Sequence, residues 1–201
     1  SPQRTCATHE KHIEMMGLQK YAEARGRIDS HRAEWEPIVE QQRATGQSVV
    51  VTIPVVFHVV YRTSTENISD AQIQSQLDVL NADFRRLNSD VDDIWPQAAD
   101  TEIEFCLASF DPQGNPSNGI LRVSTTVNGF GTNDAVKSAS SGGSDAWPAD
   151  EYLNFWVCNI GGGILGYAQF PGGGAATDTA AAADGAAAAD GAAAADGAAA
   201  A

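Results

Sequence analysis

The strongest hydrophobic pattern along the chain is the run VVVTIPVVFHVVY at residues 49–61. β-Branched and aromatic residues dominate this run, and such runs are typical of β-strands. Both alternating faces are largely apolar, so we expect a strand that is covered on both sides. Pro54 lacks an amide hydrogen, and we therefore expect part of this strand to lie at an edge or a bulge of its sheet.

Residues 69–88 carry the strongest helical pattern. Ser69 and Gln72 have the spacing of a capping box, and Ile68 and Ile73 have the spacing of a hydrophobic staple. Apolar residues then recur every three or four positions, which predicts one stripe that faces the core. That stripe consists of Ile73, Leu77, Leu80, Phe84 and Leu87.

Short apolar stretches separated by turn residues follow the predicted helix. They predict four further strands, at residues 102–110, 120–127, 152–160 and 164–170. The order of one strand, one helix and then several strands predicts an α/β (α+β) fold, with a mixed twisted sheet and a long helix against it. Residues 1–46 are rich in charge and poor in β-branched residues, so we expect helix and loop lying on another part of the protein.

The composition changes abruptly near the C-terminus, where residues 180–201 repeat the hexapeptide AAAADG. This segment has no large apolar residue and cannot bury a core. We expect residues 179–201 to be frayed helix or disorder, and we expect this low-complexity tail not to be native.

The balance of charges excludes two classes of partner. The chain has 12 Lys and Arg against 26 Asp and Glu, which gives a formal net charge of −14. Binding to nucleic acid or to an anionic membrane surface needs clustered basic residues. No apolar run approaches the roughly 20 residues that span a bilayer. We therefore expect neither nucleic acid nor membrane as a partner.

Spacing alone does not define a complete active site. His9-Glu10-Lys11-His12 has its histidines three positions apart, whereas the HExxH zinc motif needs them four apart on one helix face. His58 lies within the apolar run, where a histidine is usually a core residue with satisfied hydrogen bonds. Three cysteines allow one disulfide and one remaining thiol; they are Cys6, Cys106 and Cys158.

Four blocks of the sequence together resemble the pappalysin family of metzincin zinc metallopeptidases, in particular its short, secreted, ulilysin-like microbial members. The blocks are IPVVFHVVY, NISDAQIQSQLDVLNADFRRLNSD, AADTEIEFCLAS and YLNFWVCNIGGGILGYAQFPGG, in order from about Ile53 to Asp178. The resemblance implies that residues 47–178 are the N-terminal subdomain of the catalytic domain. It also implies that residues 1–46 are a mostly helical or irregular propeptide, and that the protein is a secreted zymogen.

The resemblance also suggests roles for individual residues. Arg4-Thr5-Cys6-Ala7-Thr8 is similar to a cysteine switch, in which the Cys6 thiolate would bind the catalytic zinc. Residues Gly166, Tyr167, Ala168 and Gln169 match the edge strand that pairs antiparallel with a substrate backbone. An ordinary edge strand is an equally good interpretation of that segment. Cys106 and Cys158 fall on predicted strands that could be neighbours, and a disulfide between them is an option that the sequence leaves open.

The sequence departs from the family in one respect: HExxHxxGxxH, which supplies the zinc ligands and the general base, does not occur in its 201 residues. The resemblance thus implies a latent zinc endopeptidase that acts on peptides through zinc-activated water, with calcium as a further cation. The 201-residue chain itself should be inactive. Two alternatives remain open, namely a non-catalytic module that binds peptides or proteins and a truncated fragment without function.

Overall fold

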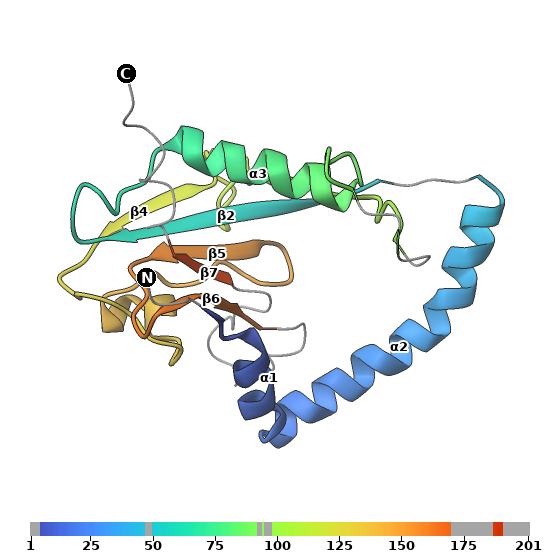
Figure 1. Ribbon diagram of the computed structural model, residues 1–201, viewed down its shortest axis with the longest axis horizontal. Helices are drawn as coiled ribbons and strands as arrows, with labels where there is room; N and C mark the ends of the chain where they lie inside the picture. The colour runs from blue at the N-terminus through green and yellow to red at the C-terminus, as the bar shows by residue number, and fades with distance from the viewer. Residues whose placement is uncertain (1–4, 47–49, 92–93, 95–97, 170–186, 191–201) are drawn as a thin grey trace.

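The sheet is organised around one long central strand, β2 (Val51–Tyr61). Figure 1 shows the computed structural model, which describes residues 5–46, 50–91, 94, 98–169 and 187–190. On one side β2 pairs first with β3 (Ile103–Leu107) and then with β4 (Ile120–Ser124). It also pairs with β5 (Leu153–Cys158), and all three pairings are parallel.

The covered strand predicted at residues 49–61 is confirmed. Every residue from Val55 to Val60 is buried, and the two faces of β2 contribute to two different hydrophobic clusters. The pairing with β5 begins only at Val55, so Pro54 lies just before it, where that side of β2 has no partner strand among the described residues. The expectation that Pro54 marks an edge is therefore confirmed as well.

The predicted helix is α3 (Asp70–Phe84), which lies along β2 on one face of the sheet (Figure 1). The capping box is present: the Gln72 amide donates to Ser69 Oγ at 3.2 Å, and the Gln72 side chain accepts from the Ser69 amide. The helix ends before the predicted residue 88, because Arg86 takes a left-handed conformation with φ 54°. Leu87 consequently lies outside the core stripe and is 76% exposed.

Two hydrophobic clusters pack on opposite faces of the sheet. Beneath α3, Ile73 and Leu77 contact side chains of β2, β3 and β5. The opposite face is covered by the connection between β4 and β5, which contains the short 3-10 helices η1 (Ala135–Lys137) and η2 (Ala139–Ser141). The fully buried Trp156 lies in this second cluster. Together these layers bear out the predicted α/β fold with a backing helix.

The far side of the sheet is mixed. It consists of β6 (Ile164–Ala168), the strand β7 (Ala187–Asp190) and the short strand β1 (Thr5–Cys6). β7 lies between β5 and β6, parallel to β5 and antiparallel to β6, and β1 lies beside β6. The expectation of frayed helix or disorder was wrong for the four residues of β7, because two unpaired strand edges offer hydrogen-bond partners to an extended backbone of any sequence.

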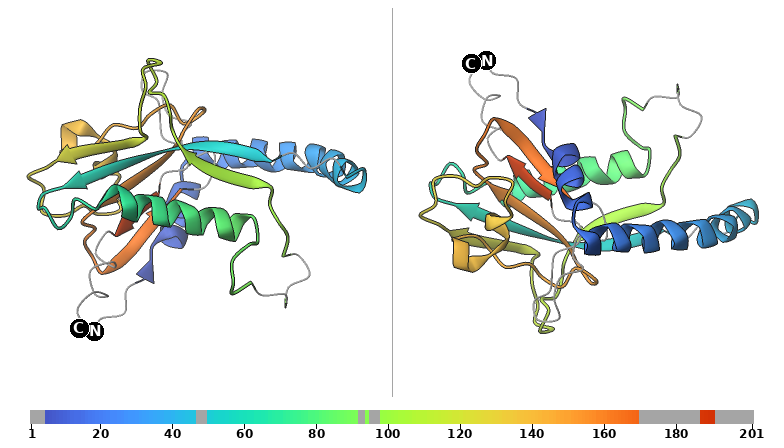
Figure 2. Two further views of the ribbon diagram at one scale, coloured as in Figure 1. Left: turned by 90° about the horizontal axis from the view of Figure 1, so that it is seen from above. Right: turned by 90° about the horizontal axis from the view of Figure 1, so that it is seen from below.

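The N-terminal region is helical, as expected. It contains α1 (Thr8–Met16) and the 26-residue α2 (Gln19–Ala44). Helix α1 contacts β6, whereas α2 extends away from the body of the protein, as both views of Figure 2 show. Neither these helices nor α3 combine the length and apolar character that a membrane-spanning helix requires.

Candidate functional site

The N-terminal segment, residues 5–8, lies along the outer side of β6. Thr5 is paired with Ile164 and Cys6 with Gly166, in parallel orientation. The Ala7 amide donates to the Gly166 carbonyl at 3.0 Å. This segment therefore uses the hydrogen-bonding edge that β6 would otherwise offer to another extended chain.

The structure brings together the residues for which a substrate-binding edge was predicted. The Ala168 amide donates to Thr8 Oγ1 at 3.0 Å, so Gly166 and Ala168 both bind the N-terminal segment through their backbones. Tyr167 and Gln169 instead direct their side chains to Asp134, with distances of 3.0 Å from the hydroxyl and 3.3 Å from Nε2. The backbones of Gly166 and Ala168 thus bind the N-terminal segment at the edge of the sheet. The side chains of Tyr167 and Gln169 bind Asp134.

Cys6 is exposed at the end of β1. Its sulfur lies 3.1 Å from Thr8 Oγ1, within hydrogen-bond distance for a thiol and a hydroxyl. Within the described part of the chain, no group of three or more His, Cys, Asp or Glu residues is arranged to hold a metal ion. Because structural and catalytic zinc sites need at least three protein ligands, Cys6 and its described neighbours do not by themselves fit zinc.

The charged side chains of the site form a cluster around Asp134. Lys11 of α1 is only 5% exposed; its ammonium lies 3.2 Å from Asp134 Oδ2 and donates to the Thr132 carbonyl at 3.0 Å. On the other side, Lys137 of η1 lies 2.7 Å from Asp134 Oδ1. Asp134 therefore joins the N-terminal helix, η1 and, through Tyr167, the edge strand.

The protonation of this cluster follows from burial and charge. Burial alone would raise the pKa of Asp134, but Lys137 and Lys11 outweigh it and hold the pKa below its usual value. Burial lowers the pKa of Lys137 against the opposing effect of Asp134, and burial together with Asp134 raises the pKa of Tyr167. At neutral pH, Asp134 is thus a carboxylate that accepts from a neutral tyrosine.

Sequence reasoning missed this cluster. Lys11 lies in a charged helix where nothing in its spacing marks it as buried, and Asp134 lies in a polar connection without periodicity. Asp134 adopts a left-handed conformation with φ 63°, which Asn and Asp tolerate better than most residues. A lone aspartate in a turn-rich stretch is too common a feature for this tolerance to have identified it.

His58 is a core residue, as predicted. Its Nδ1 lies 2.8 Å from Ser144 Oγ and its Nε2 lies 2.9 Å from Asn154 Oδ1. The same Asn154 oxygen accepts from the Trp147 amide, so Nε2 must be the nitrogen that carries the proton. Burial lowers the pKa of His58 to about 4. Ser144, His58 and Asn154 are all buried, so this group supports the core and does not present a nucleophile to substrate.

The optional disulfide between Cys106 and Cys158 is not formed. Cys106 lies opposite Pro54, whereas Cys158 follows Val157, which lies opposite Val59. β3 and β5 are also separated by β2. The two cysteines are therefore two strands apart sideways and roughly 20 Å apart along the strands, whereas a disulfide needs Cα atoms within about 7 Å.

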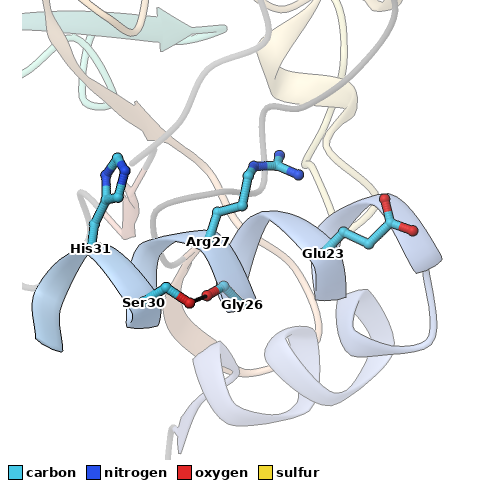
Figure 3. A pocket seen from close by; sticks show the side chains of 5 residues that line it. All are labelled: Glu23, Gly26, Arg27, Ser30 and His31. Atoms are coloured by element: carbon cyan, nitrogen blue, oxygen red, sulfur yellow. Dashed lines mark hydrogen bonds between the residues drawn. The ribbon is translucent and has the colours of Figure 1, made fainter. Parts of the chain in front are cut away.

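The two remaining histidine-containing features are unrelated to this site. His12 Nδ1 lies 2.9 Å from the hydroxyl of the buried Tyr21, a contact between α1 and α2. An open hollow on α2 contains His31, and Figure 3 shows its lining side chains on one helix face. Every residue that lines this hollow is exposed, so it offers no enclosed binding site; they are Glu23, Gly26, Arg27, Ser30 and His31.

Comparison with solved structures identifies mirolysin as a relative. A promirolysin mutant from Tannerella forsythia is 39% identical with a TM-score of 0.68, covering 92% of this chain and 59% of that one. Mature T. forsythia mirolysin in complex with a cleaved peptide is 46% identical with a TM-score of 0.64, covering 70% and 53%. Mirolysin in complex with a small compound is 52% identical with a TM-score of 0.59, covering 62% and 48%.

These matches cover about half of each mirolysin chain. No family model and no curated protein matches the sequence. Mirolysin is a metzincin of the pappalysin family, and the aligned part has the mixed sheet and backing helix that the resemblance implied. Given identities of 39–52% to mirolysin and its precursor, the chain belongs to the pappalysin family of metzincin metallopeptidases.

Proposed function

We propose that this chain contains the latency segment and the N-terminal part of the catalytic domain of a secreted zinc metallopeptidase zymogen. The observation that carries the proposal is the position of residues 5–8 on β6, in a chain of which 92% aligns with promirolysin. The boundaries at residues 46/47 and 178/179 and the secreted location are parts of this proposal.

In the proposed zymogen, the N-terminal segment blocks the edge on which substrate would bind. A peptide that extended β6 would need the carbonyl of Gly166 and the amide of Ala168, and both already bind residues 7 and 8. The segment also runs parallel to β6, whereas a substrate is expected to run antiparallel. It therefore occupies the binding edge without presenting its own backbone in the direction suited to cleavage.

Cys6 is the residue of this segment that suits zinc. A thiolate is a strong zinc ligand, and catalytic zinc keeps one position open for water. The proposed role of Cys6 is to fill that position in the zymogen. Bound zinc would supply an activated water for hydrolysis. The described residues contain no group of three or more potential metal ligands, so the geometry supports the proposal only at the N-terminal segment and the edge of β6.

The test compares the natural full-length protein with the 201-residue chain. We expect the full-length protein to hydrolyse a labelled protein substrate after removal of residues 1–46, to lose this activity with a zinc chelator, and to regain it with added zinc. The 201-residue chain should show no hydrolysis under the same conditions. Zinc-dependent cleavage by the 201-residue chain, or chelator-resistant cleavage by the full-length protein, would contradict the proposal.

Two further measurements separate the components of the proposal. A Cys6→Ala variant of the full-length protein should become active without prior cleavage if the thiolate maintains latency. A calcium-specific chelator, with zinc kept in excess, tests calcium as a further cation. Stoichiometric peptide binding without turnover by the full-length protein would instead favour the alternative of a non-catalytic binding module.

A further inference from the structure

Helix α1 has one buried side chain, that of Lys11, where it meets the body of the protein. Of the nine residues from Thr8 to Met16, only Lys11 is buried. The large apolar residues Ile13 and Met16 are 60% and 44% exposed, so hydrophobic contact contributes little to docking this helix. Besides the hydrogen bond from the Ala168 amide to Thr8 Oγ1, the main polar contact of α1 is the one between the Lys11 ammonium and the loop that contains Thr132 and Asp134.

Because the Lys11 ammonium is buried, its stability in this position depends on the groups that bind it. A buried ammonium is costly unless it is paired and hydrogen-bonded. Lys11 has a carboxylate at 3.2 Å and a carbonyl acceptor at 3.0 Å, which together compensate for its desolvation. Its other ionic neighbour, Glu14, lies 3.6 Å away with its side chain 68% exposed, and such exposed pairs contribute little.

Asp134 binds the N-terminal segment and the edge strand at the same time. Its Oδ2 lies near Lys11 and Gln169, and its Oδ1 accepts from Tyr167. Tyr167 lies on β6 between Gly166 and Ala168, whose backbones bind residues 7 and 8. One carboxylate therefore fixes α1 relative to the strand that the segment covers.

Separation of Lys11 from Asp134 has different consequences for the two residues. If the N-terminal segment leaves, Lys11 becomes hydrated, and Asp134 still has Lys137 at 2.7 Å and the Tyr167 hydroxyl at 3.0 Å. If Asp134 were lost, Lys137 would lose the carboxylate at 2.7 Å, and Lys11 would keep only the exposed Glu14 at 3.6 Å as a counter-charge. The arrangement thus lets the segment leave without disrupting the body of the protein.

We propose that Lys11 and Asp134 form an ionic lock that keeps residues 5–8 on β6 and whose opening exposes this edge. The inference rests on the proposed function only in interpreting the exposed edge as a substrate site. The lock itself is a property of the chain and is measurable without zinc or peptidase activity.

The test is backbone hydrogen exchange, followed by NMR, on the 201-residue chain and its Lys11→Met variant. Methionine keeps a long apolar side chain but removes the charge. We expect the amides of Ala7 and Ala168 to exchange at least tenfold faster in K11M, because both bind across the interface between the segment and β6. The amide of Phe57, which donates to the Gly119 carbonyl within the core, should change less than twofold.

Glu14→Gln is the matched control, since it removes the exposed ionic partner of Lys11 on the same helix. All three amides should exchange within twofold of their original rates in E14Q. Unchanged exchange at Ala7 and Ala168 in K11M would overturn the lock. Equal acceleration of all three amides in K11M would also overturn it, since Lys11 would then support the whole fold rather than the segment.

Discussion

His58 should make the stability of this protein depend strongly on pH. The imidazole is fully buried between Ser144 and Asn154 and stacks on Trp156, with ring centroids 4.7 Å apart. Burial lowers its pKa from 6.5 to about 4, against smaller opposing effects of Asn154 and Asp145. The folded chain therefore keeps the ring neutral at pH values where the unfolded chain protonates it.

The direction and size of the pH effect on stability follow from the difference between the pKa of His58 in the folded chain and in the unfolded chain. Between pH 6.5 and pH 4 the unfolded chain binds one proton more than the folded chain, so acidification favours unfolding. Each pH unit of that window corresponds to 1.36 kcal/mol, and the whole window to about 3 kcal/mol. At pH 7, His58 therefore does not lower the free energy of unfolding. Most of the decrease that it causes has occurred by pH 4.5.

The assay is urea unfolding at pH 7 and pH 4.5, for the original chain and for His58→Gln. Glutamine is neutral throughout and keeps hydrogen-bonding capacity toward Ser144 or Asn154. Because both proteins share all other titrating groups, the difference between their pH-dependent losses isolates the imidazole. We expect the original chain to lose about 2–3 kcal/mol more than the variant. Equal losses, or an NMR titration of folded His58 near pH 6.5, would refute the reasoning.

Three other predictions test the helix cap, the cysteines and a close backbone contact. Ser69→Ala should lower the free energy of unfolding by about 1 kcal/mol, measured by urea titration, because it removes the side-chain cap of α3. Gly143→Ala should be far more destabilising, by about 3 kcal/mol or more in the same assay, because a Cβ there would overlap the Val136 carbonyl. Thiol titration should find three reactive groups after denaturation, two of them fast in the native protein and one slow; the fast pair is Cys6 and Cys106, and the slow one is the buried Cys158.

Features that depend on neighbours in sequence were predictable. The apolar run at residues 49–61 became β2, and the spacing of Ser69 and Gln72 became the capping box of α3. Both signals arise within a few residues, from alternation in one case and from side-chain bonds to the first helical turn in the other. The family resemblance, which comparison with mirolysin confirmed, rests on the same contiguous blocks.

Element ends were less predictable, because they depend on backbone conformations set elsewhere in the fold. Arg86 and Glu102 both have positive φ, at 54° and 58°, and they end α3 and precede β3. Neither residue type favours this region, so composition carried no signal for these ends. The Glu102 amide donates to the Asp100 side chain at 2.8 Å, a contact that the strand pattern alone does not reveal.

The candidate site was predictable in its strands but not in its charges. The sequence indicates the segment at Cys6 and the edge at residues 166–169, and the structure places them side by side. The burial of Lys11 was not predictable, because its partner Asp134 lies more than a hundred residues away in an irregular connection. The separation of Cys106 from Cys158 likewise depends on strand order and register. Hydrophobic periodicity and capping are local properties of the chain, whereas the pairing of buried charges and the neighbours of a strand exist only once distant segments have packed together.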